Sequence, residues 1–186
     1  MSRENVEIVR QPVTVRAQSR RRLEERLGLR FPSARAFLRG AVWRLPPRSR
    51  LRQALVRRAV RLAFEATNRG DYEAAFMAYH PDVELTVPPL FAGLGDESVI
   101  RGREERVRFQ RRWNAEWGEV RFEPAEVLDL YPRLLVLGRI KGSGLGSGAA
   151  FENQWANLVT FSDGRVIREQ AFIDHGEALE AAGLRE

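Results

Sequence analysis

The sequence offers few side chains for acid–base or covalent chemistry. It contains no cysteine and two histidines, His80 and His175. The lack of cysteine excludes a disulfide framework, cysteine-ligated zinc, iron–sulfur clusters and thiol catalysis. Two histidines leave little for a histidine-rich metal site, and we expect none; we also expect no cofactor. His175 directly follows Asp174, and these two are weak candidates for an acid–base pair, the alternative being that Asp174 caps a helix.

Polar side chains within apolar segments are candidates for ligand contacts. Gln154 and Asn157 share one predicted strand, Gln170 lies in the last, and Arg139 lies in a third. The amides can bind ligand oxygens and Arg139 can steer an anion, or all four can bind neighbouring backbone, solvent or a partner subunit. Strand side chains alternate between faces, so at least one amide points away from any pocket.

Aromatic side chains are the other candidates for a pocket wall. Phe64, Trp113 and Phe172 lie in predicted helices and strands, where they can line an apolar pocket or form an ordinary core. With the four polar residues they make up the predicted ligand pocket.

The elements that position these residues follow from periodicity. Residues 51–69 carry a helical apolar stripe that ends before Gly70. Asp71 can cap a second helix that extends to Tyr79, and a third helix covers 102–117. Strands are predicted at 83–87, 119–130, 134–141, 149–161 and 165–173, with a short helix at 177–182. The order predicts an α+β fold in which helices cover one face of a curved, mostly antiparallel sheet.

The net charge of +6 is unevenly distributed. Residues 1–58 carry 16 arginines and 4 glutamates, a formal charge of +12, and the remainder carries −6. We therefore divide the chain into an arginine-rich segment, 1–50, and a domain, 51–186. The basic segment has predicted helices at 20–27, ended by Gly28, and at 37–45. It can lie on an anionic membrane, bind nucleic acid through phosphates, or pack against the acidic body or a second subunit.

Hydropathy argues against a membrane or secretory protein. No apolar run approaches the ~20 residues of a spanning helix, and the first residues lack the apolar stretch of a signal peptide. We expect a cytoplasmic protein.

Four short motifs connect residues 51–185 to a known family. They are a helix-ending turn, a strand entry, a helix start and a hairpin: N-R-G-D at 68–71, Y-H-P-D-V at 79–83, R-G-R-E-E at 101–105 and D-G-R-V at 163–166. In this order and spacing they resemble a SnoaL-like domain of the nuclear transport factor 2-like superfamily. The resemblance implies a cone, in which three helices wrap a strongly bent mixed sheet around one apolar pocket. It also implies a homodimer that pairs through the open sheet face.

Ketosteroid isomerases of this superfamily use a tyrosine and a protonated aspartic acid as oxyanion donors and an aspartate as base. The matching positions here are Ala63 for the tyrosine, Val87 for the base, and Trp155 or Ala156 for the second donor. An alanine cannot donate to an oxyanion and a valine cannot accept a proton, so this catalytic set is incomplete.

Two other catalytic sets of the superfamily are also incomplete. Limonene-epoxide hydrolases use an Asp–Arg–Asp arrangement, of which the chain retains Arg139, with Lys141 and Ala171 in place of the aspartates. The histidine and aspartate of SnoaL-type cyclases fall on Asn157 and Ala171.

We therefore expect the cone to bind a small, mostly apolar organic ligand. Cofactor-free isomerase, cyclase or hydrolase-type activity remains open, and it would require a titratable group inside the cone, for which the sequence offers Asp174, Glu152, Glu84 and His80. The alternative is a non-catalytic interaction module whose basic N-terminal segment docks on a polyanion or a membrane surface.

Overall fold

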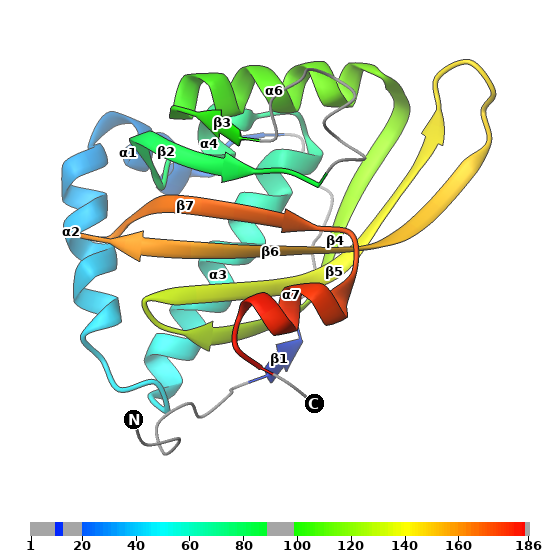
Figure 1. The fold of residues 1–186 in the computed structure, drawn as a ribbon. Coiled ribbons are helices and arrows are strands. Elements are labelled where there is room, and N and C mark those ends of the chain that lie inside the picture. Colours follow the sequence, from blue (N-terminus) through cyan, green and yellow to red (C-terminus); the bar gives the residue numbers. More distant parts are fainter. Residues whose placement is uncertain (1–9, 13–19, 89–98, 185–186) are drawn as a thin grey trace.

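The computed structural model describes residues 10–12, 20–88 and 99–184. Within them, one curved sheet has the strand order β1-β4-β5-β6-β7-β2-β3, as Figure 1 shows. All neighbouring strands are antiparallel except β2 and β7, which are parallel. The strands are β1 (Arg10–Pro12), β2 (Tyr79–Thr86), β3 (Val99–Arg101), β4 (Trp117–Leu130), β5 (Arg133–Gly144), β6 (Ala150–Ser162) and β7 (Arg165–Phe172).

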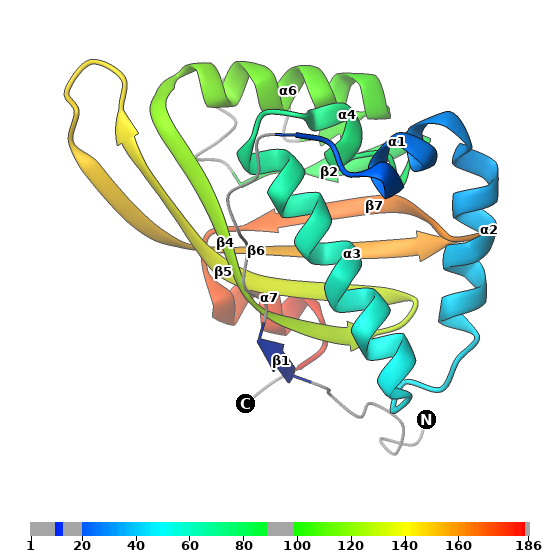
Figure 2. The ribbon, with the colours of Figure 1, turned by 180° about the vertical axis from the view of Figure 1, so that it is seen from behind.

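Helices cover both faces of this sheet unequally. On the inner face lie α3 (Arg50–Asn68), α4 (Tyr72–Ala75) and α6 (Arg103–Ala115), and on the outer face lies α7 (His175–Ala181). In Figure 2, the view from behind, α3 crosses in front of the sheet. The predicted α+β cone with three wrapping helices and a helical basic N-terminal segment is confirmed. A dimer through the outer sheet face stays a prediction, and α7 occupies part of that face.

Two predicted helix boundaries were wrong. The helix that begins after Asp71 ends at Ala75, and Tyr79 already belongs to β2, where it pairs with Val166 of β7. Pro81 disfavours helical backbone at the residue before it, which agrees with an extended chain there. In the N-terminal segment, α1 (Leu23–Arg30) continues through Gly28, because a single glycine weakens a helix without ending it.

The N-terminal segment packs on the domain through α1 and α2 (Pro32–Trp43). Arg52 of α3 is buried and forms a bidentate ion pair with Asp129 of β4, at 2.7 and 2.8 Å. Its Nη1 also donates to the carbonyl oxygens of Trp43 and Leu45. The Trp43 ring stacks on Tyr131, 5.1 Å between centroids. These contacts fix the end of α2 to the sheet.

Ion pairs hold α1 and the turn before it against the end of α3. Arg21 binds the Asp71 carboxylate with two hydrogen bonds of 2.6 Å, and Glu25 accepts from Arg69 at 2.6 Å. Intramolecular packing is therefore one use of the basic segment. Whether residues 1–50 form a unit apart from 51–186 stays a prediction. No helix in the described ranges is long and apolar enough to cross a membrane.

Candidate functional site: a cavity inside the cone

A cavity of about 240 Å³ lies between the inner face of the sheet and helices α3 and α6. Aromatic and aliphatic side chains form most of its wall, among them Phe64, Trp113, Phe122 and Val136. Phe122 packs against Trp155 edge to face, with 5.3 Å between ring centroids. Ligand cavities typically measure about 300–1,000 Å³, and this one lies just below that range, so it suits a small molecule.

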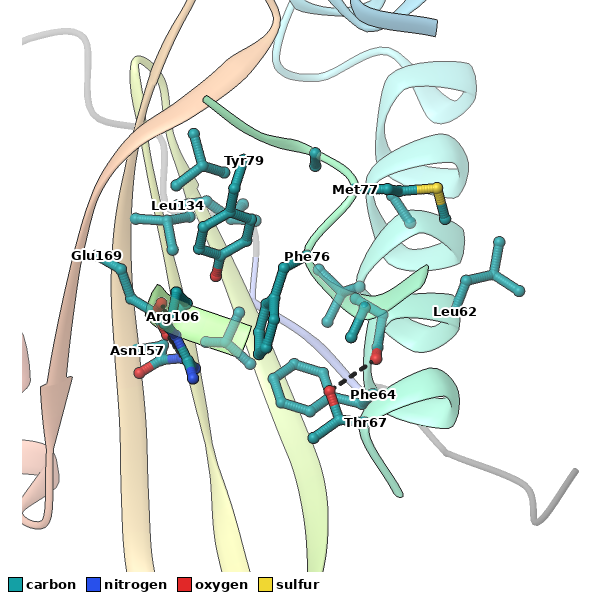
Figure 3. A pocket seen from close by; sticks show the side chains of 18 of the residues that line it. Leu62, Phe64, Thr67, Phe76, Met77, Tyr79, Arg106, Leu134, Asn157 and Glu169 are labelled. Atoms are coloured by element: carbon teal, nitrogen blue, oxygen red, sulfur yellow. Dashed lines mark hydrogen bonds and ion pairs between the residues drawn. The ribbon is translucent and has the colours of Figure 1, made fainter. Parts of the chain in front are cut away.

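A buried ion pair interrupts the apolar wall. Arg106 of α6 donates from Nε to Oε2 of Glu169 at 2.8 Å and from Nη2 to Oε1 at 3.2 Å. The two residues are 6% and 1% exposed. The guanidinium also lies 4.1 Å from the Phe76 ring centroid, a distance typical of cation–π contact. Figure 3 shows this pair at one side of the pocket, with Asn157 and Tyr79 next to it.

Neighbouring polar groups complete this cluster. Asn157 of β6 donates from Nδ2 to Oε1 of Glu169 at 2.6 Å, and Gln110 accepts from Nη1 of Arg106 at 2.8 Å. The Tyr79 hydroxyl points toward the same carboxylate. We call Arg106, Glu169, Asn157, Gln110 and Tyr79 the polar cluster. Both oxygens of Glu169 thus accept hydrogen bonds from the protein.

Electrostatics fix the protonation of two members. Burial raises the pKa of Tyr79 well above its usual range, and the negative charge of Glu169 raises it further. Burial lowers the pKa of Arg106, but the carboxylate of Glu169 outweighs that effect and the net change is upward. Tyr79 is therefore a neutral hydroxyl and Arg106 a cation at physiological pH.

One atom of the cluster has no partner in the described part of the chain. Oδ1 of Asn157 is buried and accepts no hydrogen bond. The neighbouring carboxylate of Glu169 fixes the orientation of the Asn157 amide. A carboxylate oxygen can only accept, so it faces the Nδ2 group, and Oδ1 lies on the far side of the amide. A buried unpaired acceptor costs about 1–3 kcal/mol, so the site favours a molecule that brings an N–H or O–H donor.

The predicted pocket residues do not all lie on the cavity face of the sheet. Phe64, Trp113 and Asn157 line the cavity. The other four do not. Arg139 is exposed and pairs with Glu152, and Gln154 accepts a hydrogen bond from the His175 backbone N–H. Phe172 packs under α7, and Gln170, which follows Glu169, lies on the opposite face of β7.

The predicted acid–base candidates also lie outside this cavity. Asp174 caps α7, accepting from the Glu177 backbone N–H at 2.9 Å. His175 Nε2 lies 2.9 Å from the Gly138 carbonyl oxygen and 3.1 Å from that of Trp155. Glu84, Glu152 and His80 are likewise not among its lining residues. The described residues contain no cluster of three or more histidine, aspartate and glutamate side chains suited to a metal ion.

The sequence reasoning missed the charged members of the cluster. Helical spacing could have found Arg106 together with the neutral Gln110, because they lie seven and three residues before Trp113, on the same face of α6. Strand alternation could have found Glu169, two residues before Ala171, which also lines the cavity.

The family model of the SnoaL-like domain matches residues 60–169. The chain belongs to the SnoaL-like domain family. That range includes every member of the polar cluster, whereas α1 and α2 lie before it. A comparison with curated proteins gave no match.

Solved structures agree with the cone fold of this SnoaL-like domain. An NTF2-like protein of unknown function from Burkholderia pseudomallei is 25% identical, with a TM-score of 0.57 over 66% of this chain and 93% of its own. A protein assigned as a SnoaL-like polyketide cyclase, from a Jannaschia species, is 18% identical, with a TM-score of 0.54 over 67% and 88%. A protein with a ketosteroid isomerase-like fold from Catenulispora acidiphila, in complex with trimethylamine, is 15% identical, with a TM-score of 0.53 over 68% and 92%.

Proposed function

We propose that the SnoaL-like domain binds a small, mostly apolar organic molecule inside the cone and accepts a hydrogen bond from it at Oδ1 of Asn157. The observation that carries this proposal is the buried, unpartnered Oδ1 atom of Asn157, a residue that lines a mostly apolar cavity. The apolar wall favours the body of the ligand through the hydrophobic effect, and Asn157 orients it.

The polar cluster supports binding better than proton abstraction. A general base must have a free lone pair within reach of the substrate proton. Both oxygens of Glu169 accept from Arg106, and one also accepts from Asn157. These three bonds leave one of the roughly four lone-pair positions of the carboxylate, so if the protein is an enzyme, its isomerase, cyclase or hydrolase-type reaction would use that position or need the network to open.

Fluorescence of N-phenyl-1-naphthylamine tests the proposal, because this neutral dye brightens in apolar surroundings and carries one N–H donor. We expect saturable brightening with the wild-type protein. Ala63→Phe places a ring at the cavity wall and should weaken dye binding at least tenfold. Ala54→Phe is the matched control, on the exposed side of the same helix. Equal binding by all three proteins, or none by the wild type, would contradict the proposal.

A second candidate function rests on the surface of α1 and α2. Phe37 and Leu38 are 73% and 63% exposed, and the helices carry further exposed apolar side chains at Leu23, Leu27 and Phe31. Two exposed arginines, Arg26 and Arg30, lie among them. Apolar side chains beside cations suit the interface of an anionic membrane better than nucleic acid, which needs only the cations.

Sedimentation with lipid vesicles tests this candidate. Wild-type protein should bind phosphatidylglycerol vesicles and not phosphatidylcholine vesicles, and Phe37→Glu with Leu38→Glu should abolish binding. Leu145→Glu, at a similarly exposed leucine in the β5–β6 connection, should bind normally. Retention on heparin without vesicle binding would instead indicate a polyanion partner.

A further inference from the structure

The cavity opens between α2 and α3, beside two arginines. Leu55 and Ala59 of α3 line the cavity and are exposed, which places the opening at their side. Arg35 and Arg39 of α2 line the same cavity and are half-buried. Figure 2 shows α2 at the edge of the sheet and α3 across its inner face.

Both arginines donate to backbone carbonyl oxygens and neither pairs with a carboxylate in the described part of the chain, although the charges of Glu24 and Glu25 act on Arg35. Arg39 donates from Nε to the Gly164 carbonyl oxygen at 2.7 Å, and Arg35 donates from Nη1 to the Glu24 carbonyl oxygen at 2.8 Å. Within the described ranges, neither forms an ion pair, and both terminal nitrogens of Arg39 are without a hydrogen bond. The other charges that act on Arg39 are those of Arg35 and Arg165, both positive.

The lack of an anion is energetically significant. Burial and the two positive neighbours lower the pKa of Arg39 to about 10. A half-buried cation of this kind is stabilised by any anion that reaches it, and a guanidinium binds a carboxylate through two parallel hydrogen bonds.

We infer that the natural ligand is a small organic acid, whose apolar body fills the cone and whose carboxylate binds Arg39 at the opening between α2 and α3. The inference rests on the proposed function, because the carboxylate reaches Arg39 only if the body of the molecule occupies the cavity. The ligand class follows from one continuous cavity that is apolar inside and cationic at its opening. The inference also gives α2 a part in ligand recognition, although α2 precedes the residues that match the family model, 60–169.

Displacement of N-phenyl-1-naphthylamine by decanoate and by its methyl ester tests the inference. Both have the same apolar chain, and at pH 8 only decanoate carries a charge. Wild-type protein should bind decanoate about tenfold more tightly than the ester, as expected for hydrogen bonds to a charged group. Arg39→Met should remove this preference and leave ester binding within about twofold.

Arg44→Met is the matched control, since Arg44 follows α2, is exposed and does not line the cavity. It should keep the wild-type preference. Equal affinity of the wild type for acid and ester overturns the inference while the proposed function stands. An equal loss of decanoate and ester binding in Arg39→Met also overturns the inference, because such a loss would indicate that Arg39 has a structural role. If N-phenyl-1-naphthylamine, decanoate and methyl decanoate all fail to bind the wild-type protein, the proposed function fails as well.

Discussion

Arg106 and Glu169 meet through two hydrogen bonds inside the cone, although 63 residues separate them in the chain. The pair connects α6 to β7 and fixes the polar side of the cavity. Because neither charge has access to bulk water, each depends on the other for compensation.

Removing one charge of this pair should therefore be costly. We expect Glu169→Gln to lower the free energy of unfolding by about 3–5 kcal/mol, since it leaves the Arg106 charge buried and uncompensated. Glu84→Gln, which breaks the exposed pair with Arg101, should cost less than about 1 kcal/mol. Urea denaturation measures both. The double variant Arg106→Met with Glu169→Met should recover much of the loss, and equal costs for Glu169→Gln and Glu84→Gln would disprove the role of burial.

Recognition of a donor should depend on Asn157. We expect wild-type protein to bind 1-naphthol about three- to tenfold more tightly than 1-methylnaphthalene, since a net hydrogen bond contributes about 0.5–1.5 kcal/mol. Asn157→Leu should remove that difference. Dye displacement measures it, and Gln154→Leu, at a position outside the cavity, is the control. A preference for naphthol that survives in Asn157→Leu would show that another group binds the hydroxyl.

Gly164 in the β6–β7 turn should be required for the position of α2. Its φ is +69°, and a Cβ atom there would overlap the Ala36 carbonyl oxygen of α2. Gly183 has a similar φ of +76° with no atom near, so Gly183→Ala should cost only the backbone strain, about 1–2 kcal/mol. Gly164→Ala should destabilise more and increase amide exchange in α2. Equal effects of the two changes would mean that α2 adjusts freely.

Asp71 should make stability sensitive to acid. Burial raises the pKa of this carboxyl, but hydrogen bonds from Arg21, Arg69 and the Ala74 backbone outweigh burial and lower it overall. A lowered pKa means that its stabilising contribution is present above the unfolded value, about 3.9, and is lost as the pH falls through the folded value. Wild-type stability should thus fall more steeply below about pH 4 than that of Asp71→Asn. Asp82→Asn, with a side chain 91% exposed, should keep the wild-type slope.

The fold could be predicted because its signals are local. The end of α3 before Gly70 and the hairpin at Asp163-Gly164 depend on glycines with positive φ, which the sequence displays directly. The helix after Asp71 was predicted too long because its apolar residues continue into β2, where Tyr79 is a partly buried strand residue instead.

The cavity face of the strands could not be predicted because both faces of the sheet are buried. On β6, Trp155 and Val159 face the cavity, whereas Ala156 and Leu158 pack under α7. Apolar and polar residues therefore do not alternate along this part of β6, and the sequence does not indicate which face of the strand lines the cavity. Arg106 and Glu169 were missed for a related reason: charged residues are usually exposed, and the partner that permits their burial lies far away in sequence.

The most direct test is a crystal structure of the protein soaked with 6-bromo-2-naphthol. Anomalous scattering from bromine locates the molecule independently of any side-chain interpretation. We expect a single bromine peak inside the cone, with the hydroxyl oxygen at about 2.7–3.0 Å from Oδ1 of Asn157. Bromine found only on the surface of α1 and α2, or a cone closed by its own side chains, would contradict the account.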